Sequence, residues 1–176
     1  MSSYYSLSSI LSTSQPLPST LAFDIPHLGI LDSRPGETLN ANTQLSLPLY
    51  LAAFLAIQRI GNSAPLTLDL PSSLSPKVLN ALKADPRTVE LRQLAPHFYE
   101  SAERVLELFE EDDIVDVLTE TFQKRAGEIA DMAQNVRKVS SADNFLRGLD
   151  ERERELFRAA HDSSKAVRAW MGEKRG

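Results

Sequence analysis

The sequence predicts a mainly α-helical protein in which a C-terminal α-helical bundle follows a small β-containing N-terminal domain. Three observations favour this fold class. Seven of the ten prolines lie at or before Pro71, and only six of the 24 acidic and 19 basic residues lie before residue 76. After residue 75, apolar residues recur every three or four positions, the spacing of an amphipathic helix. We therefore expect a β-rich domain over residues 1–74 and a helical bundle domain over residues 75–176.

The N-terminal part contains short apolar segments separated by proline and glycine. One segment, Pro48–Ile60, is apolar all round and predicts a helix that is buried inside the protein or between proteins and ends at Gly61. The first residues, Tyr4–Leu11, fit either a short strand or a helical turn. Short strands are expected over Thr20–Ile25, Gln44–Leu47 and Pro65–Leu70.

The C-terminal part has clearer helical periodicity and recognisable helix ends. Ser75 and Pro76 suit the first positions of a helix that runs to Ala84. Asp150 and Glu153 resemble a capping box, so the last segment is expected to form two helices with a bend at residues 148–150. The intervening helices are expected over Pro96–Glu110 and Asp112–Lys138.

Four consecutive residues, Pro96, His97, Phe98 and Tyr99, form a compact motif at the start of a predicted helix. Proline is tolerated in the first helical turn because the missing N–H would have no partner there. The three planar side chains that follow suit packing better than catalysis, so this motif is interpreted as structural.

Composition and motif searches exclude several classes of function. The chain has no cysteine, which excludes disulfides and thiolate metal sites, and its three histidines have no metal-ligand spacing. We therefore predict a protein that is not an enzyme, with no catalytic residue, no cofactor and no metal. The net charge of −5 argues against DNA binding by the lone chain. The apolar segment Leu45–Ile57 is too short for a membrane, because a span needs about 20 apolar residues.

Two charged segments are expected to be exposed. Nine carboxylates lie between Glu100 and Glu120, and they are read as a solvated helix junction, with an acidic surface for a basic partner as the alternative. The mixed-charge run Glu151–Glu155 is read as an exposed helix face. Trp170 and Met171 are expected to pin the last helix to the bundle, and protein binding is the second interpretation.

Eight short motifs, in this order and spacing, make the chain resemble the Psf-three family of subunits of the GINS complex, a four-protein factor of eukaryotic DNA replication. The resemblance covers nearly the whole chain. Its motifs are Tyr5–Leu11 (YSLSSIL), Pro26–Gly29 (PHLG), Leu45–Ala52 (LSLPLYLA), Asp85–Pro86, Val89–Leu91 (VEL), Pro96–Tyr99 (PHFY), Gln134–Asn135 and Leu149–Phe157 (LDERERELF).

The resemblance implies a nuclear, non-enzymatic scaffold subunit of a heterotetramer. Its expected partners are three sister subunits, most closely the Psf-two type, and through them the Mcm helicase ring and the Cdc-forty-five type protein. A generic helical adaptor, an enzyme with an unrecognised site and a DNA-binding protein are the alternatives. The candidate residues for subunit contacts are Leu49, Tyr50, Phe54, Ile57, Val117, Phe122, Ile129, Met132 and Trp170.

Overall fold

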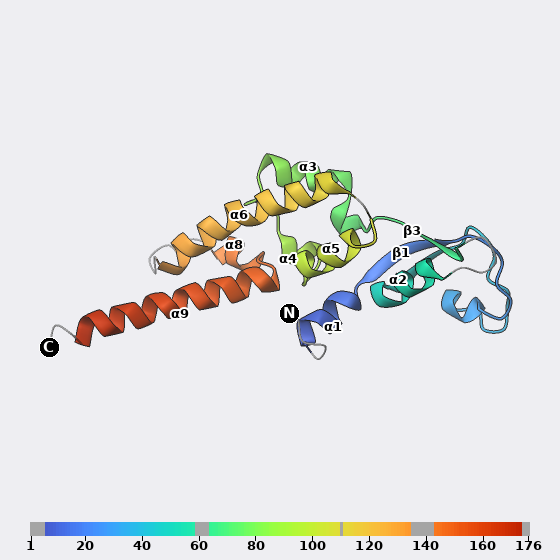
Figure 1. Ribbon diagram of the computed structural model, residues 1–176, viewed down its shortest axis with the longest axis horizontal. Coiled ribbons are helices and arrows are strands. Elements are labelled where there is room, and N and C mark those ends of the chain that lie inside the picture. Colours follow the sequence, from blue (N-terminus) through green and yellow to red (C-terminus); the bar gives the residue numbers. More distant parts are fainter. Residues whose placement is uncertain (1–5, 59–63, 110, 135–142, 174–176) are drawn as a thin grey trace. The chain divides into compact units, whose positions relative to one another are not determined.

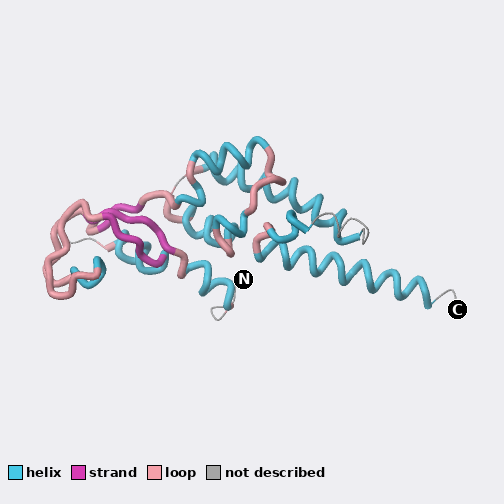
Figure 2. The backbone as a smooth tube through the Cα atoms, turned by 180° about the vertical axis from the view of Figure 1, so that it is seen from behind, coloured by secondary structure: helices cyan, strands magenta, loops and turns pink. Residues whose placement is uncertain are grey.

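The computed structural model describes residues 6–58, 64–109, 111–134 and 143–173. The chain divides into two compact units. The first comprises Met1–Ser75 together with Glu103–Phe109, and the second comprises Pro76–Ala102 together with Glu110–Gly176. Helices predominate, and strands occur only in the first unit among the described residues, so the predicted fold class is confirmed (Figure 2).

The first unit is built on a three-stranded antiparallel sheet with strand order β2-β1-β3. Its strands are β1 (Pro16–Leu21), β2 (Gln44–Pro48) and β3 (Leu66–Leu68). Alternate residues of β1 and β2 point into the core, including Leu17, Leu21, Leu45 and Leu47. Successive side chains of a strand point to opposite faces, so this alternation is typical of a strand with one buried face.

The central strand does not lie where the sequence predicted it. A strand was expected over Thr20–Ile25, but β1 covers Pro16–Leu21 and includes Pro16 and Pro18. Proline is rare in central strands because it cannot donate a ladder hydrogen bond. Here β3 pairs only with Ser19–Leu21, so both prolines lie outside the stretch that is paired on two sides.

Two helices complete the first unit (Figure 1). The first residues form a helix, α1 (Leu7–Thr13), which resolves the two possibilities left open for them. Helix α2 (Leu49–Ile57) follows β2 directly and buries Leu49 and Ala52. The sequence placed this helix over Pro48–Ile60, and its predicted end at Ile60 and Gly61 lies outside the described residues.

A closed loop connects β1 to β2. Ile25 and Leu39 form an isolated antiparallel bridge, and a 3-10 helix spans Gly29–Asp32 between them. Gly29 is essential to this loop, because a Cβ atom there would lie 2.3 Å from the carbonyl oxygen of Arg34. The PHLG motif therefore has a structural explanation in close backbone packing.

The second unit is helical, and its longest helices are α6 (Asp112–Gln134) and α9 (Glu151–Glu173), which lie side by side (Figures 1 and 2). The shorter helices are α3 (Pro76–Ala84), α4 (Leu91–Leu94), α5 (Phe98–Leu106) and α8 (Asp143–Arg147). Helix α5 begins at Phe98, two residues later than predicted, and its second half belongs to the first unit. The predicted end of α6 at Lys138 lies outside the described residues.

Candidate protein-interaction surfaces

Eight of the nine predicted contact residues fall into two groups by burial, and the ninth is intermediate. Tyr50, Phe54, Ile57 and Trp170 are 56–73% exposed. Phe122 is half-buried. The other four pack inside the chain with at most 8% of their surface exposed: Leu49, Val117, Ile129 and Met132. Tyr50, Phe54 and Ile57 are therefore accessible to a partner, whereas the buried group stabilises the chain itself.

Helix α2 presents the clearest exposed apolar face. Its inner side carries Leu49 and Ala52, which are buried in the first unit. Its outer side carries Tyr50, Phe54 and Ile57, which are 59%, 60% and 73% exposed. Positions i, i+4 and i+7 lie on one side of an α-helix, so these three side chains form a single stripe, hereafter the α2 stripe.

Helix α9 presents a second exposed apolar surface near its end. Val167, Trp170 and Met171 are 50%, 56% and 57% exposed and occupy positions i, i+3 and i+4. We call these three residues the α9 stripe. Trp170 and Met171, which were expected to pin this helix to the bundle, are both more than half exposed.

Smaller exposed apolar positions lie elsewhere in the first unit. Helix α1 exposes Leu7, Ile10 and Leu11, and the loop between β1 and β2 exposes Ile30 and Leu31. Scattered exposed apolar residues are normal, but contiguous groups commonly mark interaction sites. The first unit thus exposes apolar surface on both of its helices.

A buried ion pair holds the helices of the second unit together. Arg125 of α6 and Glu153 of α9 are both fully buried, with Nε–Oε1 and Nη2–Oε2 distances of 2.6 and 2.9 Å. Arg125 Nη1 also donates to the carbonyl oxygens of Pro86 and Val89 at 2.7 and 3.0 Å. The Arg125 guanidinium lies 4.9 Å from the centre of the Phe145 ring. A bidentate pair with these extra partners offsets the cost of removing both charges from water.

Asp150 joins the starts of two helices. Its Oδ1 accepts a hydrogen bond from the backbone N–H of Phe98 at 2.8 Å, and its Oδ2 accepts one from Arg152 at 3.2 Å. Glu153 Oε2 accepts from the Asp150 N–H at 3.1 Å, which completes the predicted capping box. Burial raises the pKa of the Asp150 carboxyl, while hydrogen bonds from the N–H groups of Phe98, Glu151 and Arg152 act in the opposite direction. One carboxylate therefore caps both α5 and α9.

The Pro96–Tyr99 motif has the structural surroundings that the sequence suggested. Phe98 and Tyr99 are buried, and their rings meet edge to face with centroids 5.4 Å apart. Tyr99 meets Phe122 in the same way at 5.2 Å. The Tyr99 hydroxyl donates to Glu153 Oε1 at 3.1 Å, and burial, followed by the nearby Glu153 charge, raises the pKa of Tyr99. Tyr99 therefore stays protonated and serves as a donor in the buried network.

Sequence reasoning missed the charged centre of this network. The interpretation of Glu151–Glu155 as an exposed face is wrong for Glu153, which is fully buried. Two signals pointed to the network. Glu153 was already assigned to a capping box, and Arg125 lies four residues from both Thr121 and Ile129 on the buried side of α6.

The charged and polar groups of the described residues do not assemble into a metal site. No group of three or more His, Asp or Glu side chains there could hold a metal ion. In the acidic segment, Glu107 pairs with Arg104 of α5, and Glu120 pairs with Lys124 on α6. Among the described helices, none is both long enough and apolar enough to cross a bilayer.

Comparison with known proteins assigns both parts of the chain to one complex. Residues 73–172 match the GINS complex protein helical bundle domain (Sld5), and residues 5–57 match the PSF3 N-terminal domain. The chain is 58% identical to the DNA replication complex GINS protein psf3 of Aspergillus fumigatus over 97% of both chains. It is 53% identical to the corresponding Phaeosphaeria nodorum protein, again over 97% of both chains. It is 32% identical to the Saccharomyces cerevisiae protein, over 97% of this chain and 99% of that one.

These full-length similarities agree with the motifs, the fold and the exposed apolar helix faces described above. The chain therefore belongs to the Psf3 family of GINS complex subunits, which take part in DNA replication.

Proposed function

We propose that this protein is a non-enzymatic scaffold subunit of a heterotetrameric GINS complex in the nucleus. It binds three sister subunits, most closely the Psf-two type. Through the complex it supports the Mcm helicase ring and the Cdc-forty-five type protein during initiation and elongation of DNA replication. The names of its relatives support membership of the complex, and the exposed apolar surfaces support a role in binding other proteins.

The observation that carries this proposal is the α2 stripe. Its three large apolar side chains are more than half exposed, although the helix is anchored to the sheet through its other side. Burying a side chain of this size contributes about 1.5–3 kcal/mol. A partner that covered the stripe would therefore gain several kcal/mol before the entropy cost of association.

We further propose that residues 1–74 and 75–176 act as separate domains of the scaffold. The contacts within the chain define two compact units that separate near Ser75. The match to the N-terminal family model ends at residue 57, and the match to the helical bundle model begins at residue 73. Residues 103–109 belong to the first compact unit, so the start of the second domain also contributes to the first.

Co-expression with three sister subunits, followed by size-exclusion chromatography, tests the proposed function. We expect a single 1:1:1:1 complex that contains this chain and shows no cofactor-dependent activity. Recovery of the chain as a monodisperse monomer in the presence of all three partners would contradict the proposal. Assembly with an unrelated protein instead would favour the generic adaptor. For the lone chain, whose net charge is −5, we expect no salt-dependent DNA binding.

A further inference from the structure

Four arginines from three helices lie together on one surface of the second unit, hereafter the arginine cluster. Its members are Arg92 of α4, Arg147 of α8, and Arg154 and Arg158 of α9. The backbone joins α4 to the end of α8, because the Arg92 N–H donates to the Gly148 carbonyl at 3.2 Å. Gly148 also packs closely on Glu90, whose Cγ and Cα would lie 3.2 and 3.3 Å from a Cβ atom there. Close backbone packing therefore holds the helices that carry the cluster.

One carboxylate, Glu151, is shared by three members of the cluster. Its oxygens lie 3.7 to 3.9 Å from one nitrogen each of Arg92, Arg154 and Arg158. Hydrogen bonds between a guanidinium and a carboxylate are about 2.7–2.9 Å long, so these contacts are electrostatic attraction without hydrogen bonding. Each guanidinium has five N–H donors. Glu151 therefore leaves most of the hydrogen-bonding capacity of the cluster unused.

Arg147 is the least engaged member of the cluster. Its side chain is exposed, and its guanidinium has no ion pair or hydrogen bond with any residue that the structure describes. Together with Arg92 it lines a pocket of about 510 Å³, which is also lined by Glu90 and Gln93. The Gln93 amide donates to the Glu90 carboxylate. An anionic group that entered this pocket would meet two guanidiniums with free donors.

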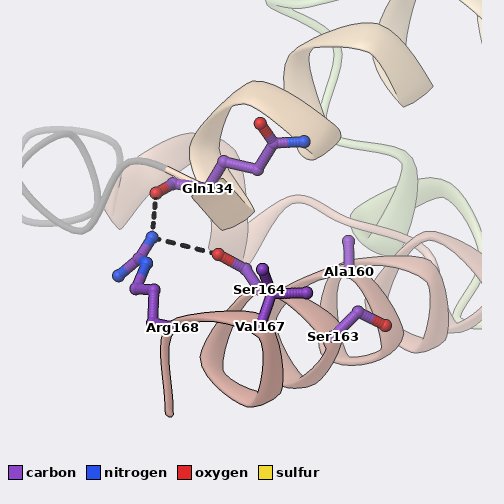
Figure 3. Close-up of a pocket in the computed structure, with 6 residues that line it drawn as sticks. All are labelled: Gln134, Ala160, Ser163, Ser164, Val167 and Arg168. Atoms are coloured by element: carbon purple, nitrogen blue, oxygen red, sulfur yellow. Dashed lines mark hydrogen bonds between the residues drawn. The ribbon is translucent and has the colours of Figure 1, made fainter. Parts of the chain in front are cut away.

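The pocket between α6 and α9 has a different environment (Figure 3). Its arginine, Arg168, donates hydrogen bonds to the carbonyl oxygen of Gln134 and, at 3.0 Å, to Ser164 Oγ. Along α9, Arg168 is about 25 Å from Glu151, whereas charges are screened over about 10 Å at 0.1 M salt. Arg168 is therefore a matched comparison for the arginine cluster, with the same charge on the same helix.

The cluster is basic although the chain has a net charge of −5. Its four arginines stand beside three carboxylates, Glu90, Glu151 and, one turn beyond it on α9, Glu155. Duplex DNA is a poor match, because its phosphates form a long regular array and these carboxylates interrupt a continuous basic track. A short peptide rich in Asp and Glu is a better match, because its separate carboxylates can each form a bidentate pair with a guanidinium.

We propose that the arginine cluster is a docking surface for a carboxylate-rich peptide segment of a partner protein. Carboxylates of that segment pair with Arg92 and Arg147 at the pocket and with Arg154 and Arg158 along α9. The docking surface does not depend on the proposed function, because it rests on the charges and geometry of this chain alone. Its complementarity to the partner is electrostatic, so affinity falls as the salt concentration rises.

Fluorescence anisotropy with a fluorescein-labelled octaglutamate peptide tests this surface on the full chain at low salt. We expect Arg147→Gln to weaken binding about threefold, and Arg154→Gln with Arg158→Gln to weaken it about fivefold. Glu151→Gln should strengthen binding about twofold, because it removes the carboxylate that competes for three guanidiniums. Arg168→Gln is the matched control, since it removes the same charge from α9 at a distance and should leave the affinity unchanged.

Opposite shifts for Glu151→Gln and Arg147→Gln would support the docking surface. It is overturned if the unaltered chain does not bind the peptide at low salt. It also fails if Arg168→Gln weakens binding as much as Arg147→Gln, because only the overall charge would then matter. Tighter binding of fluorescein-labelled single-stranded or duplex DNA, with the same dependence on Arg147, would assign the cluster to nucleic acid instead.

Discussion

At the scale of single residues, Arg125 has the most connected environment in the described chain. Its guanidinium meets the Glu153 carboxylate, two carbonyl oxygens of the segment between α3 and α4, and the Phe145 ring. Glu153 in turn accepts hydrogen bonds from Tyr99 and from the Asp150 backbone. The charge of each partner is thus satisfied only while α5, α6, α8 and α9 are all in place, which couples these helices.

Removing one member of the buried pair is expected to destabilise the protein strongly. Arg125→Met leaves the Glu153 carboxylate buried without its counter-ion, at a cost of about 3–5 kcal/mol in the free energy of unfolding. The double variant Arg125→Met with Glu153→Met should recover at least half of that loss, because no uncompensated charge remains. Urea unfolding of the full chain, followed by circular dichroism, measures both values.

The exposed pair of Glu120 and Lys124 provides the comparison. These side chains are 2.7 Å apart, and the nearby Lys124 ammonium holds the pKa of Glu120 below its usual range. Both side chains are in solvent, where an ion pair contributes little. Lys124→Ala should therefore leave the urea midpoint unchanged. A similar midpoint for Arg125→Met and Lys124→Ala would show that burial does not strengthen the Arg125–Glu153 pair.

At the scale of elements, the loop between β1 and β2 is defined by close backbone contacts rather than by a large apolar core. The Ile25–Leu39 bridge closes it, and Gly29 packs against the carbonyl groups of Arg34 and Glu37. The Gly29 N–H donates to the Glu37 carbonyl at 3.1 Å, and the Arg34 N–H donates to the Gly29 carbonyl at 2.8 Å. Any side chain at position 29 must therefore push backbone away.

Gly29→Ala and Gly127→Ala are expected to have opposite effects. At position 29 the new Cβ would lie 2.3 and 2.8 Å from two carbonyl oxygens, and such overpacking costs about 2–3 kcal/mol. Gly127 lies inside α6 with no atom near its Cβ position, so alanine there should add about 0.5–1 kcal/mol of stability. Thermal unfolding shows whether each variant is less or more stable than the unaltered chain. A stabilising Gly29→Ala would contradict the loop geometry.

At the scale of the whole molecule, the chain buries its charged network and leaves apolar stripes in solvent. Both features depart from the usual pattern, which the apolar core of the chain otherwise follows, with large apolar side chains inside and charged ones outside. The α2 stripe and the α9 stripe contain six such exposed side chains. Family membership in a multi-subunit complex provides the physical reason, because partners can cover these surfaces.

Phe54→Asp is expected to prevent assembly without preventing folding of the chain. Phe54 is 60% exposed, so the carboxylate is tolerated in the free chain, whereas burying it unpaired against a partner costs several kcal/mol. Gln58→Asp is the control, because it places the same charge on an exposed position just past α2. The fraction of chain that co-elutes with the sister subunits measures the effect. Unimpaired co-elution of Phe54→Asp would show that the α2 stripe is not an interface.

The sequence by itself determined the fold class, the helix over Pro76–Ala84, the capping box of Asp150 and Glu153, and the resemblance to the family. These features are local or depend on motif order, so they can be read along one chain. The sequence also identified the α2 segment as unusually apolar, and the structure shows which of its two faces is exposed.

Only the tertiary structure decided which charges are buried and which apolar residues are exposed. Glu153 and Trp170 lie on the same helix, yet Glu153 is fully buried and Trp170 is 56% exposed. Hydropathy predicts the opposite order. For Glu153 the cause is spatial, because its carboxylate meets Arg125, which lies 28 positions away in sequence. Burial depends on what the rest of the chain brings to a residue, and local sequence does not contain that information.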